Sequence, residues 1–371
     1  MKRVAAAVLL PLVWTLPGPQ RASGGTVEAR IHLGAWAPEN LPWKTERVLD
    51  RMTGVRATTV MGGVMWMTRA RVPGGPVVDD PGGDYAIPME VAFVRPRGYS
   101  RFVADVDRAT IASLRSGIAV MPETERHLRG GHERLVLTLN SRRVRVKAVV
   151  SNQTTQGHEV LMSRPPPESF RRHYRFVLIS KHPDVPRERI RRRIQSLLTE
   201  GQHLRLRSES QTTYLRYADQ VHPNMVFKKN FGEFSALPSH EGAIPIRRSW
   251  VERHITVGRV PILGNVRCHR KLFPQLRGAL REVRDRGLAH TIRPDEYAGC
   301  FNSRYVATLP GTRISRHTWG LAVDMNVNGN SFGQTPHQDP RLVKIMEKWG
   351  FAWGGRWPLP DGMHFEWKTW P

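Results

Sequence analysis

Two segments in the C-terminal third of the chain repeat apolar residues with a helical period. One lies between Pro274 and Gly287, and its apolar positions are Leu276, Ala279, Leu280 and Val283. The other begins at Asp339 and ends at Gly350, and its stripe is Leu342, Ile345, Met346 and Trp349. Asp is a good N-cap, Pro suits a first helical turn, and Gly often follows the last turn. The pattern predicts two amphipathic helices.

Other segments alternate with a period of two, which is typical of strands. Asn140-Ser141 separates two such runs, whose apolar positions are Leu135, Leu137, Leu139, Val144, Val146 and Ala148. They predict a hairpin in a region that is mostly strand from residue 86 to 150. An apolar run at 176–179 predicts another strand, and residues 184–201 predict a helix. Residues 25–75 give no assignable pattern.

These elements predict an α+β fold. Short alternating runs between the two C-terminal helices indicate a small antiparallel sheet flanked by helices, and a β-rich region precedes it. We predict three parts: a signal peptide at 1–24, an N-terminal region of unknown role at 25–230 that is β-rich around 86–180, and a C-terminal domain at 232–371.

The first residues favour secretion. Lys2 and Arg3 precede an apolar run at 4–13, and small residues follow at 22–24. This order is typical of a secretory signal, although a buried N-terminal helix is the alternative. No later segment has the apolar length of a membrane helix. We therefore predict a secreted or cell-wall-associated protein.

The net charge indicates the class of partner, and the cysteine count limits the chain to at most one disulfide. The 371 residues include 57 Lys plus Arg and 32 Asp plus Glu, a net charge of +25, which predicts attraction to polyanions. This charge fits nucleic acid, anionic lipid or an anionic cell wall, and because no nucleic-acid-binding motif accompanies it, nucleic acid is not expected. The only two cysteines, Cys268 and Cys300, either form one disulfide or stay as separate buried thiols.

Residues 315–327 join a turn to an alternating stretch. If the stretch is a strand, Asp324 projects from the face opposite to the apolar positions Leu321, Val323, Met325 and Val327. His317 precedes Gly320, in a turn that can bring the imidazole over the same face as Asp324. A histidine and a carboxylate that converge in this way form half of a zinc site.

A second alternating stretch follows Asp361. His364 and Glu366 share one face, and the apolar residues Met363, Phe365 and Trp367 share the other. Asp361 can reach a water on the metal without binding the metal. Two histidines, one carboxylate ligand and a spare acid fit a catalytic zinc site, which keeps its fourth position open.

Together these motifs resemble the D-alanyl-D-alanine carboxypeptidase (VanY-like) family of zinc peptidases. The resemblance covers about residues 232–371 and rests on Ser315-x-His317-x-x-Gly320-x-Ala322-x-Asp324 and Asp361-x-x-His364. Flanking residues agree: Gly299-Cys300-Phe301 with Arg304, Trp353-Gly354-Gly355-x-Trp357 and Met363-His364-Phe365-Glu366.

The resemblance implies roles for individual residues. His317, Asp324 and His364 would bind Zn²⁺, Asp361 would be the general base, and Arg304 would support the scissile carbonyl. Arg313 and Arg316 compete with Arg304 on chemistry alone. Ser315 would either bind substrate or shape the turn, and Trp319, Trp353 and Trp357 would line the cleft or pack in the core.

The expected activity is hydrolysis of peptide bonds in peptidoglycan stem peptides. A D-alanyl-D-alanine carboxypeptidase is the first expectation. The alternatives are an endopeptidase of the L-Ala-D-Glu type and a non-catalytic basic protein that binds the cell wall.

Overall fold

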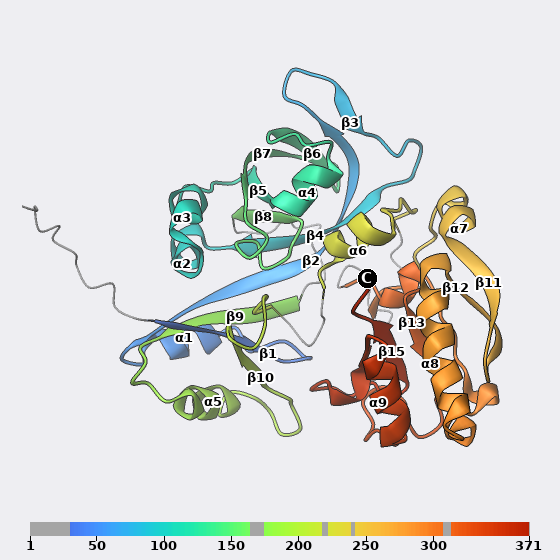
Figure 1. Ribbon diagram of the computed structural model, residues 1–371. Helices are drawn as coiled ribbons and strands as arrows, with labels where there is room; N and C mark the ends of the chain where they lie inside the picture. The colour runs from blue at the N-terminus through green and yellow to red at the C-terminus, as the bar shows by residue number, and fades with distance from the viewer. Residues whose placement is uncertain (1–29, 164–173, 217–221, 239–241, 307–312, 371) are drawn as a thin grey trace, which may run out of the picture.

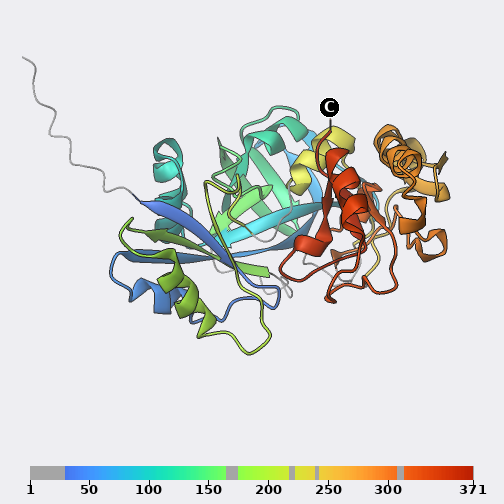
Figure 2. The same cartoon turned by 60° about the horizontal axis from the view of Figure 1, so that its bottom comes forward.

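A computed structural model describes residues 30–163, 174–216, 222–238, 242–306 and 313–370. Two parts lie side by side in it, a β-rich N-terminal part and a smaller C-terminal part that contains α8 and α9 (Figure 1; Figure 2). Helices, strands and a small antiparallel sheet near the C-terminus are all present, as the sequence predicts. The expected signal peptide at 1–24 lies outside the described residues. No described helix has the length and apolarity needed to cross a membrane.

The N-terminal part is built on one ten-stranded sheet among the described residues. Its strands are β1 (Ile31–Trp36), β2 (Val55–Arg71), β3 (Val77–Asp79), β4 (Ile87–Val94), β5 (Ile118–Pro122), β6 (Leu135–Leu139), β7 (Arg142–Val150), β8 (Val160–Ser163), β9 (Tyr174–Lys181) and β10 (Arg205–Ser208). Its helices are α1 (Thr45–Asp50), α2 (Pro96–Tyr99), α3 (Asp105–Ala112), α4 (Glu123–Leu128) and α5 (Arg187–Gln195).

The long strand β2 organises this sheet. Its first half pairs with β9 and its second half with β4, and its end pairs with β6. Because the order β2-β4-β8-β5-β7-β6 returns to β2, these strands close into a ring. Met65, Met89, Met121, Leu137 and Val146 belong to one buried apolar cluster contributed by five of these strands.

The predicted hairpin is confirmed. β6 and β7 pair in antiparallel register from Leu135↔Val146 to Leu139↔Arg142. Asn140 and Ser141 both have positive φ, which is the turn that suits the twist of two strands joined by two residues. The predicted strand at 176–179 lies within β9. The predicted helix at 184–201 is present but shorter, as α5.

Two expectations for this region need correction. Helices α2, α3 and α4 interrupt the stretch 86–150, which was expected to be mostly strand. Residues 25–75 contain β1, α1 and β2, although their sequence has no clear period. β2 is buried on both faces for most of its length, so its apolar residues do not alternate with polar ones.

The C-terminal part has two predicted helices and a small sheet. α8 (Phe273–Asp285) and α9 (Pro340–Lys348) confirm the helical pattern, and the Asp339 side chain accepts a hydrogen bond from the Arg341 N–H at 2.7 Å. The three-stranded antiparallel sheet has the order β13-β15-β14. The strands of this sheet are β13 (Ala322–Asp324), β14 (Phe351–Trp353) and β15 (His364–Trp367). The C-terminal part also contains α6 (Asn224–Phe231), α7 (Arg248–His254), β11 (Ile255–Val260) and β12 (Gly264–His269).

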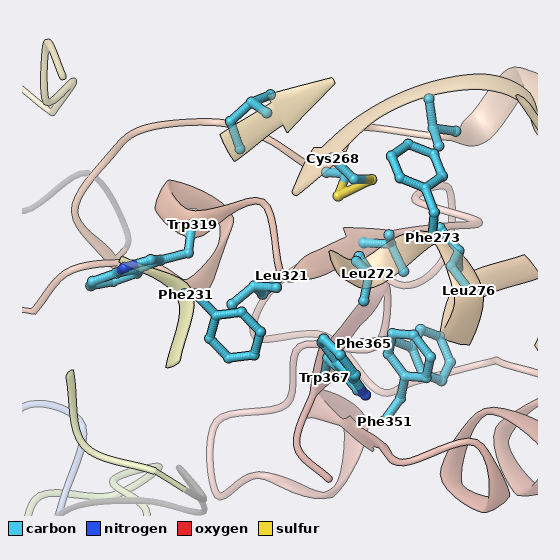
Figure 3. Close-up of a cluster of buried hydrophobic side chains, with 14 of the residues drawn as sticks. Phe231, Cys268, Leu272, Phe273, Leu276, Trp319, Leu321, Phe351, Phe365 and Trp367 are labelled. Atoms are coloured by element: carbon cyan, nitrogen blue, oxygen red, sulfur yellow. A yellow bond between two sulfur atoms is a disulfide. The ribbon is translucent and has the colours of Figure 1, made fainter. Parts of the chain in front are cut away.

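A disulfide joins Cys268 on β12 to Cys300 in the loop before β13 (Figure 3). The two Cα atoms are 5.3 Å apart. The disulfide lies in the same apolar cluster as Leu272, Leu321 and Phe365. It therefore fixes the loop that precedes the turn of His317 against the core.

A buried ionic network connects the two parts. Lys228 on α6 contacts Glu159, beside β8, at 2.5 Å and Glu233 at 3.1 Å, and Glu233 also pairs with Arg129. Lys228 and Glu159 are fully buried. The expected boundary between the two parts at residue 232 stays a prediction. Helix α6 precedes this boundary in sequence, and its Phe227 and Phe231 pack into the core of the C-terminal part.

Replacing Lys228 by methionine should destabilise the whole protein. Methionine fills a similar volume, but it leaves Glu159 and Glu233 buried with less compensating charge. Loss of one partner from a buried ionic group costs about 3–5 kcal/mol. Urea unfolding should show this loss for Lys228→Met. The exposed neighbour gives the control, since Lys229→Met should change stability by less than about 0.5 kcal/mol. Equal stability of the two variants would contradict the role of the network.

Candidate metal centre

The antiparallel pairing of β13 with β15 brings Asp324 and His364 together. The two residues are directly opposite each other in the register. Opposed residues project from the same face of a sheet, with their Cβ atoms about 4.5–5.5 Å apart. The alternation of polar and apolar residues in both segments therefore determines that these two side chains meet, although they are 40 positions apart.

His317 reaches the same face from a short helical turn at Arg316–Trp319. The Ser315 side chain caps this turn by accepting a hydrogen bond from the His317 N–H at 3.3 Å. Gly320 ends it with a φ of 65°, and a Cβ there would lie 2.6 Å from the backbone nitrogen of His269. Only glycine fits both demands, so Gly320 turns the chain directly into β13.

Three potential ligand atoms converge. His317 Nε2 lies 3.1 Å from Asp324 Oδ2 and 3.1 Å from His364 Nδ1, and His364 Nδ1 lies 3.0 Å from Asp324 Oδ1. Ligands of a tetrahedral zinc ion at about 2.1 Å are separated by about 3.4 Å. The three side chains form the one such group found among the residues that the structure describes.

Hydrogen bonds on the far side of each ring assign the tautomers. His317 Nδ1 lies 2.8 Å from the Cys300 carbonyl oxygen and must donate to it, so Nε2 carries a lone pair. His364 Nε2 lies 3.4 Å from Glu366 Oε2 and donates to it, so in the neutral ring Nδ1 carries the lone pair. Two lone pairs and a carboxylate therefore face one another, an arrangement that calls for a cation and fits zinc.

Electrostatics in the cluster favour positive charge. Burial would raise the pKa of Asp324, but His317 and His364 hold it well below its usual range. Burial would lower the pKa of His364, but hydrogen bonds to Asp324 and Glu366 raise it to about 10. The same field that favours an imidazolium favours a metal ion in its place. All three side chains are buried.

Asp361 lies beside the cluster and outside it. The charges of His364, Asp324, His317 and Arg304 all act on its carboxyl, and burial raises its pKa above the ordinary value. Oδ1 is buried and has no hydrogen-bond partner among the described residues. The backbone approaches closely here, since a Cβ on Gly354 would lie 2.6 Å from the Asp361 carbonyl oxygen. Asp361 is thus a desolvated carboxylate with one oxygen available for a proton.

Of the three candidate arginines, Arg304 is the one whose charge acts on Asp361. The Arg316 guanidinium donates to Asn224 Oδ1 and, at 2.6 Å, to the His222 carbonyl oxygen. Arg313 lies over the Trp36 ring, 5.9 Å from its centroid. The role of Arg304 at the scissile carbonyl stays a prediction, which its electrostatic effect on Asp361 supports.

Of the two roles left open for Trp319, the structure shows the core role. Trp319 is fully buried, packs against Phe227 and Phe234, and donates from Nε1 to the Gly232 carbonyl oxygen at 3.3 Å. It belongs to the core (Figure 3) and cannot touch substrate. Ser315 has the capping contact described above. Trp357 is half-buried, and its ring centroid lies 5.3 Å from that of His364.

Two further groups at the centre were given no role from the sequence. Glu366 holds His364, and its place on the same strand face as His364 could have indicated this contact. The Tyr297 hydroxyl is buried without a hydrogen-bond partner among the described residues, and burial raises its pKa, with a further contribution from the charge of Asp324. The sequence around Tyr297 has no pattern that indicates a site residue, because only the tertiary fold brings this side chain near Asp324.

Comparison with known proteins gives one informative match. A search of curated proteins finds none that matches. Among solved structures, the periplasmic region of MacB from Actinobacillus actinomycetemcomitans matches at 11% identity over 48% of this chain and 89% of that chain, with a TM-score of 0.31, too low to support an argument. Residues 310–367 match the family model of D-alanyl-D-alanine carboxypeptidase. The resemblance predicted from the motifs is therefore confirmed for the segment that holds His317, Asp324, Asp361 and His364, which is similar to that peptidase family.

Proposed function

We propose that this protein is a zinc-dependent peptidase that hydrolyses peptide bonds in peptidoglycan stem peptides. The observation that carries the proposal is the convergence of His317, Asp324 and His364, with Asp361 beside them. Three protein ligands leave one position for water or substrate, as in catalytic rather than structural zinc sites. The family match of residues 310–367 supports the peptidase class.

His317, Asp324 and His364 would hold the zinc ion. When bound, zinc supplies Lewis acidity, which makes water a better nucleophile at neutral pH and polarises a carbonyl. Asp361 Oδ1 accepts a proton from the attacking water and then returns it to the leaving amine. Its raised pKa suits both transfers, because the carboxyl is a stronger base than an ordinary aspartate.

Arg304 would bind the oxygen of the scissile carbonyl as negative charge develops on it. A fixed guanidinium in a site shielded from water is effective in this role. Glu366 and the Cys300 carbonyl hold the two imidazoles in the tautomers that the ligand set needs.

We infer a D-alanyl-D-alanine carboxypeptidase as the first assignment, on the family match. An endopeptidase of the L-Ala-D-Glu type uses the same groups on an internal bond. The N-terminal pattern of charge and apolar residues supports secretion, and the net charge of +25 supports attachment to anionic cell-wall polymers. A stem pentapeptide with its C-terminal carboxylate free or amidated separates the two peptidases, because a carboxypeptidase cleaves only the free form.

The protein should retain one zinc ion per chain only when all three ligand residues are present. His317→Ala, Asp324→Ala and His364→Ala should each lose zinc on dialysis, whereas the wild type retains about one ion per chain. Glu366→Gln should keep the ion and bind it about 10–100-fold more weakly, since it removes only the support of His364. Mass spectrometry of the metal and titration against a chelator measure both effects. The exposed His290 provides the control, and zinc loss in His290→Ala equal to that in His364→Ala would contradict the site.

Asp361 and Arg304 should matter for turnover and not for zinc content. Asp361→Asn should lower kcat by about 10²–10⁴ because it removes the proton acceptor. Arg304→Gln should lower it by about 10²–10³ because it removes one oxyanion donor. Release of D-alanine from a synthetic stem pentapeptide measures both. Arg313→Gln is the matched control and should change the rate by less than about tenfold. Undiminished cleavage by Asp361→Asn, or cleavage that survives a chelator, would reject the mechanism.

A further inference from the structure

Phe332 is an exposed aromatic residue in the loop between β13 and α9. It is 45% exposed, whereas most phenylalanines of the C-terminal part are buried in the core. Burial of a phenylalanine side chain is worth about 1.5–3 kcal/mol relative to leaving it in water. Single exposed apolar residues are common on protein surfaces, so the meaning of Phe332 depends on where the fold places it.

Residues 331–334 form a tight turn that fixes the position of Phe332. The Gln334 N–H donates to the Ser331 carbonyl oxygen at 3.0 Å, and Gly333 has a φ of 85°. Glycine with a positive φ at the third position is typical of a type II turn, in which Phe332 occupies the second position. The backbone of Phe332 is therefore ordered in advance, and little conformational entropy is lost there when a ligand binds.

A backbone hydrogen bond attaches this turn to the residue before Asp361. The Gly333 N–H donates to the Pro360 carbonyl oxygen at 2.7 Å. A Cβ on Gly333 would lie 3.6 Å from Leu359 Cδ1, so the Leu359 side chain packs against the turn. Phe332 precedes Gly333, and Asp361 follows Pro360. Phe332 and the proposed base are therefore neighbours in space, although they are far apart in the sequence.

The loop is anchored on the other side of Asp361 as well. The Met363 N–H donates to the Asn330 carbonyl oxygen at 3.0 Å. The buried Asn330 side chain donates to the Asn326 carbonyl oxygen at 2.9 Å and accepts from the His337 N–H at 2.7 Å. The turn is therefore held at the metal centre by contacts on both sides of the proposed base.

The proposed mechanism defines which part of a substrate lies closest to this turn. Asp361 returns a proton to the leaving amine, so the nitrogen of the leaving residue lies against the Asp361 carboxylate. The side chain of that residue is attached one carbon atom away from the nitrogen, which brings it within reach of Phe332. In a stem peptide that ends in D-alanyl-D-alanine, this side chain is the methyl group of the terminal D-alanine.

We propose that Phe332 contacts the methyl group of the leaving D-alanine and selects this residue over glycine. The inference rests on the proposed function, since it requires the metal centre to release a C-terminal residue. A methyl group gains free energy when it is buried against an aromatic ring. One such carbon in an apolar pocket is worth about 10–200-fold in discrimination, and the open position of Phe332 favours the lower end of this range.

Two synthetic stem pentapeptides test the proposal with the full-length, zinc-loaded protein. One ends in D-Ala-D-Ala and the other in D-Ala-Gly, and release of the terminal amino acid gives kcat/KM for each. The wild type should prefer the first peptide by about tenfold. Phe332→Ala should reduce this preference to less than about threefold. Phe332→Leu should retain most of it, because leucine keeps an apolar contact.

Val257→Ala gives the matched control, since it also removes an exposed apolar side chain from the C-terminal part. It should keep the preference of the wild type. The ratio compares two substrates on one enzyme, so partial loss of folding or of zinc lowers both rates and leaves the ratio unchanged. Equal preference in Phe332→Ala and the wild type would overturn the proposal, and so would an equal loss of preference in Val257→Ala.

Binding without turnover gives a second measurement. In zinc-loaded Asp361→Asn, calorimetry with the D-Ala-D-Ala peptide should show about tenfold weaker binding when Phe332→Ala is added. Unchanged binding would overturn the contact with the methyl group. Absence of zinc-dependent release from either peptide by the wild type would reject the carboxypeptidase together with this contact. Release without a preference between the two peptides would reject the contact alone.

Discussion

Three electron-pair donors that face one another at 3.0–3.1 Å in a buried site form the constraint on which the C-terminal part depends. Two imidazoles and a carboxylate can lie this close only with a cation among them, which is either a ring proton on His364 or a metal ion. Much of the local structure serves to keep them there. The β13–β15 register holds Asp324 opposite His364, the capped turn and Gly320 direct His317, and Glu366 and the Cys300 carbonyl fix the ring tautomers.

The hydrophobic core holds the two strands that carry Asp324 and His364 in this register. Phe365 and Val323 alternate with the ligands on their strands and are fully buried, so a slip of one residue in register would move both ligands into the core and apolar groups into the site. The disulfide between Cys268 and Cys300 holds the loop whose carbonyl contacts His317. Stability and metal binding therefore depend on the same elements.

The sequence predicted the site better than it predicted the N-terminal part. His317, Asp324 and His364 were accessible because a period of two and one turn decide where each side chain points. β2 was missed because it is buried on both faces, so no alternation marks it. The sequence left the role of Trp319 open, because a large aromatic near a ligand suits a cleft or a core equally well, and only the packing against Phe227 and Phe234 decides.

X-ray absorption spectroscopy of the zinc-loaded protein tests the central claim most directly. The account predicts two imidazole nitrogens and one carboxylate oxygen at about 2.0–2.2 Å, with one further light atom from solvent. The His364→Ala variant should lose one of the two imidazole contributions in whatever zinc it retains. A spectrum with four protein ligands, or one that His364→Ala leaves unchanged, would contradict the assignment of this cluster as an open metal centre.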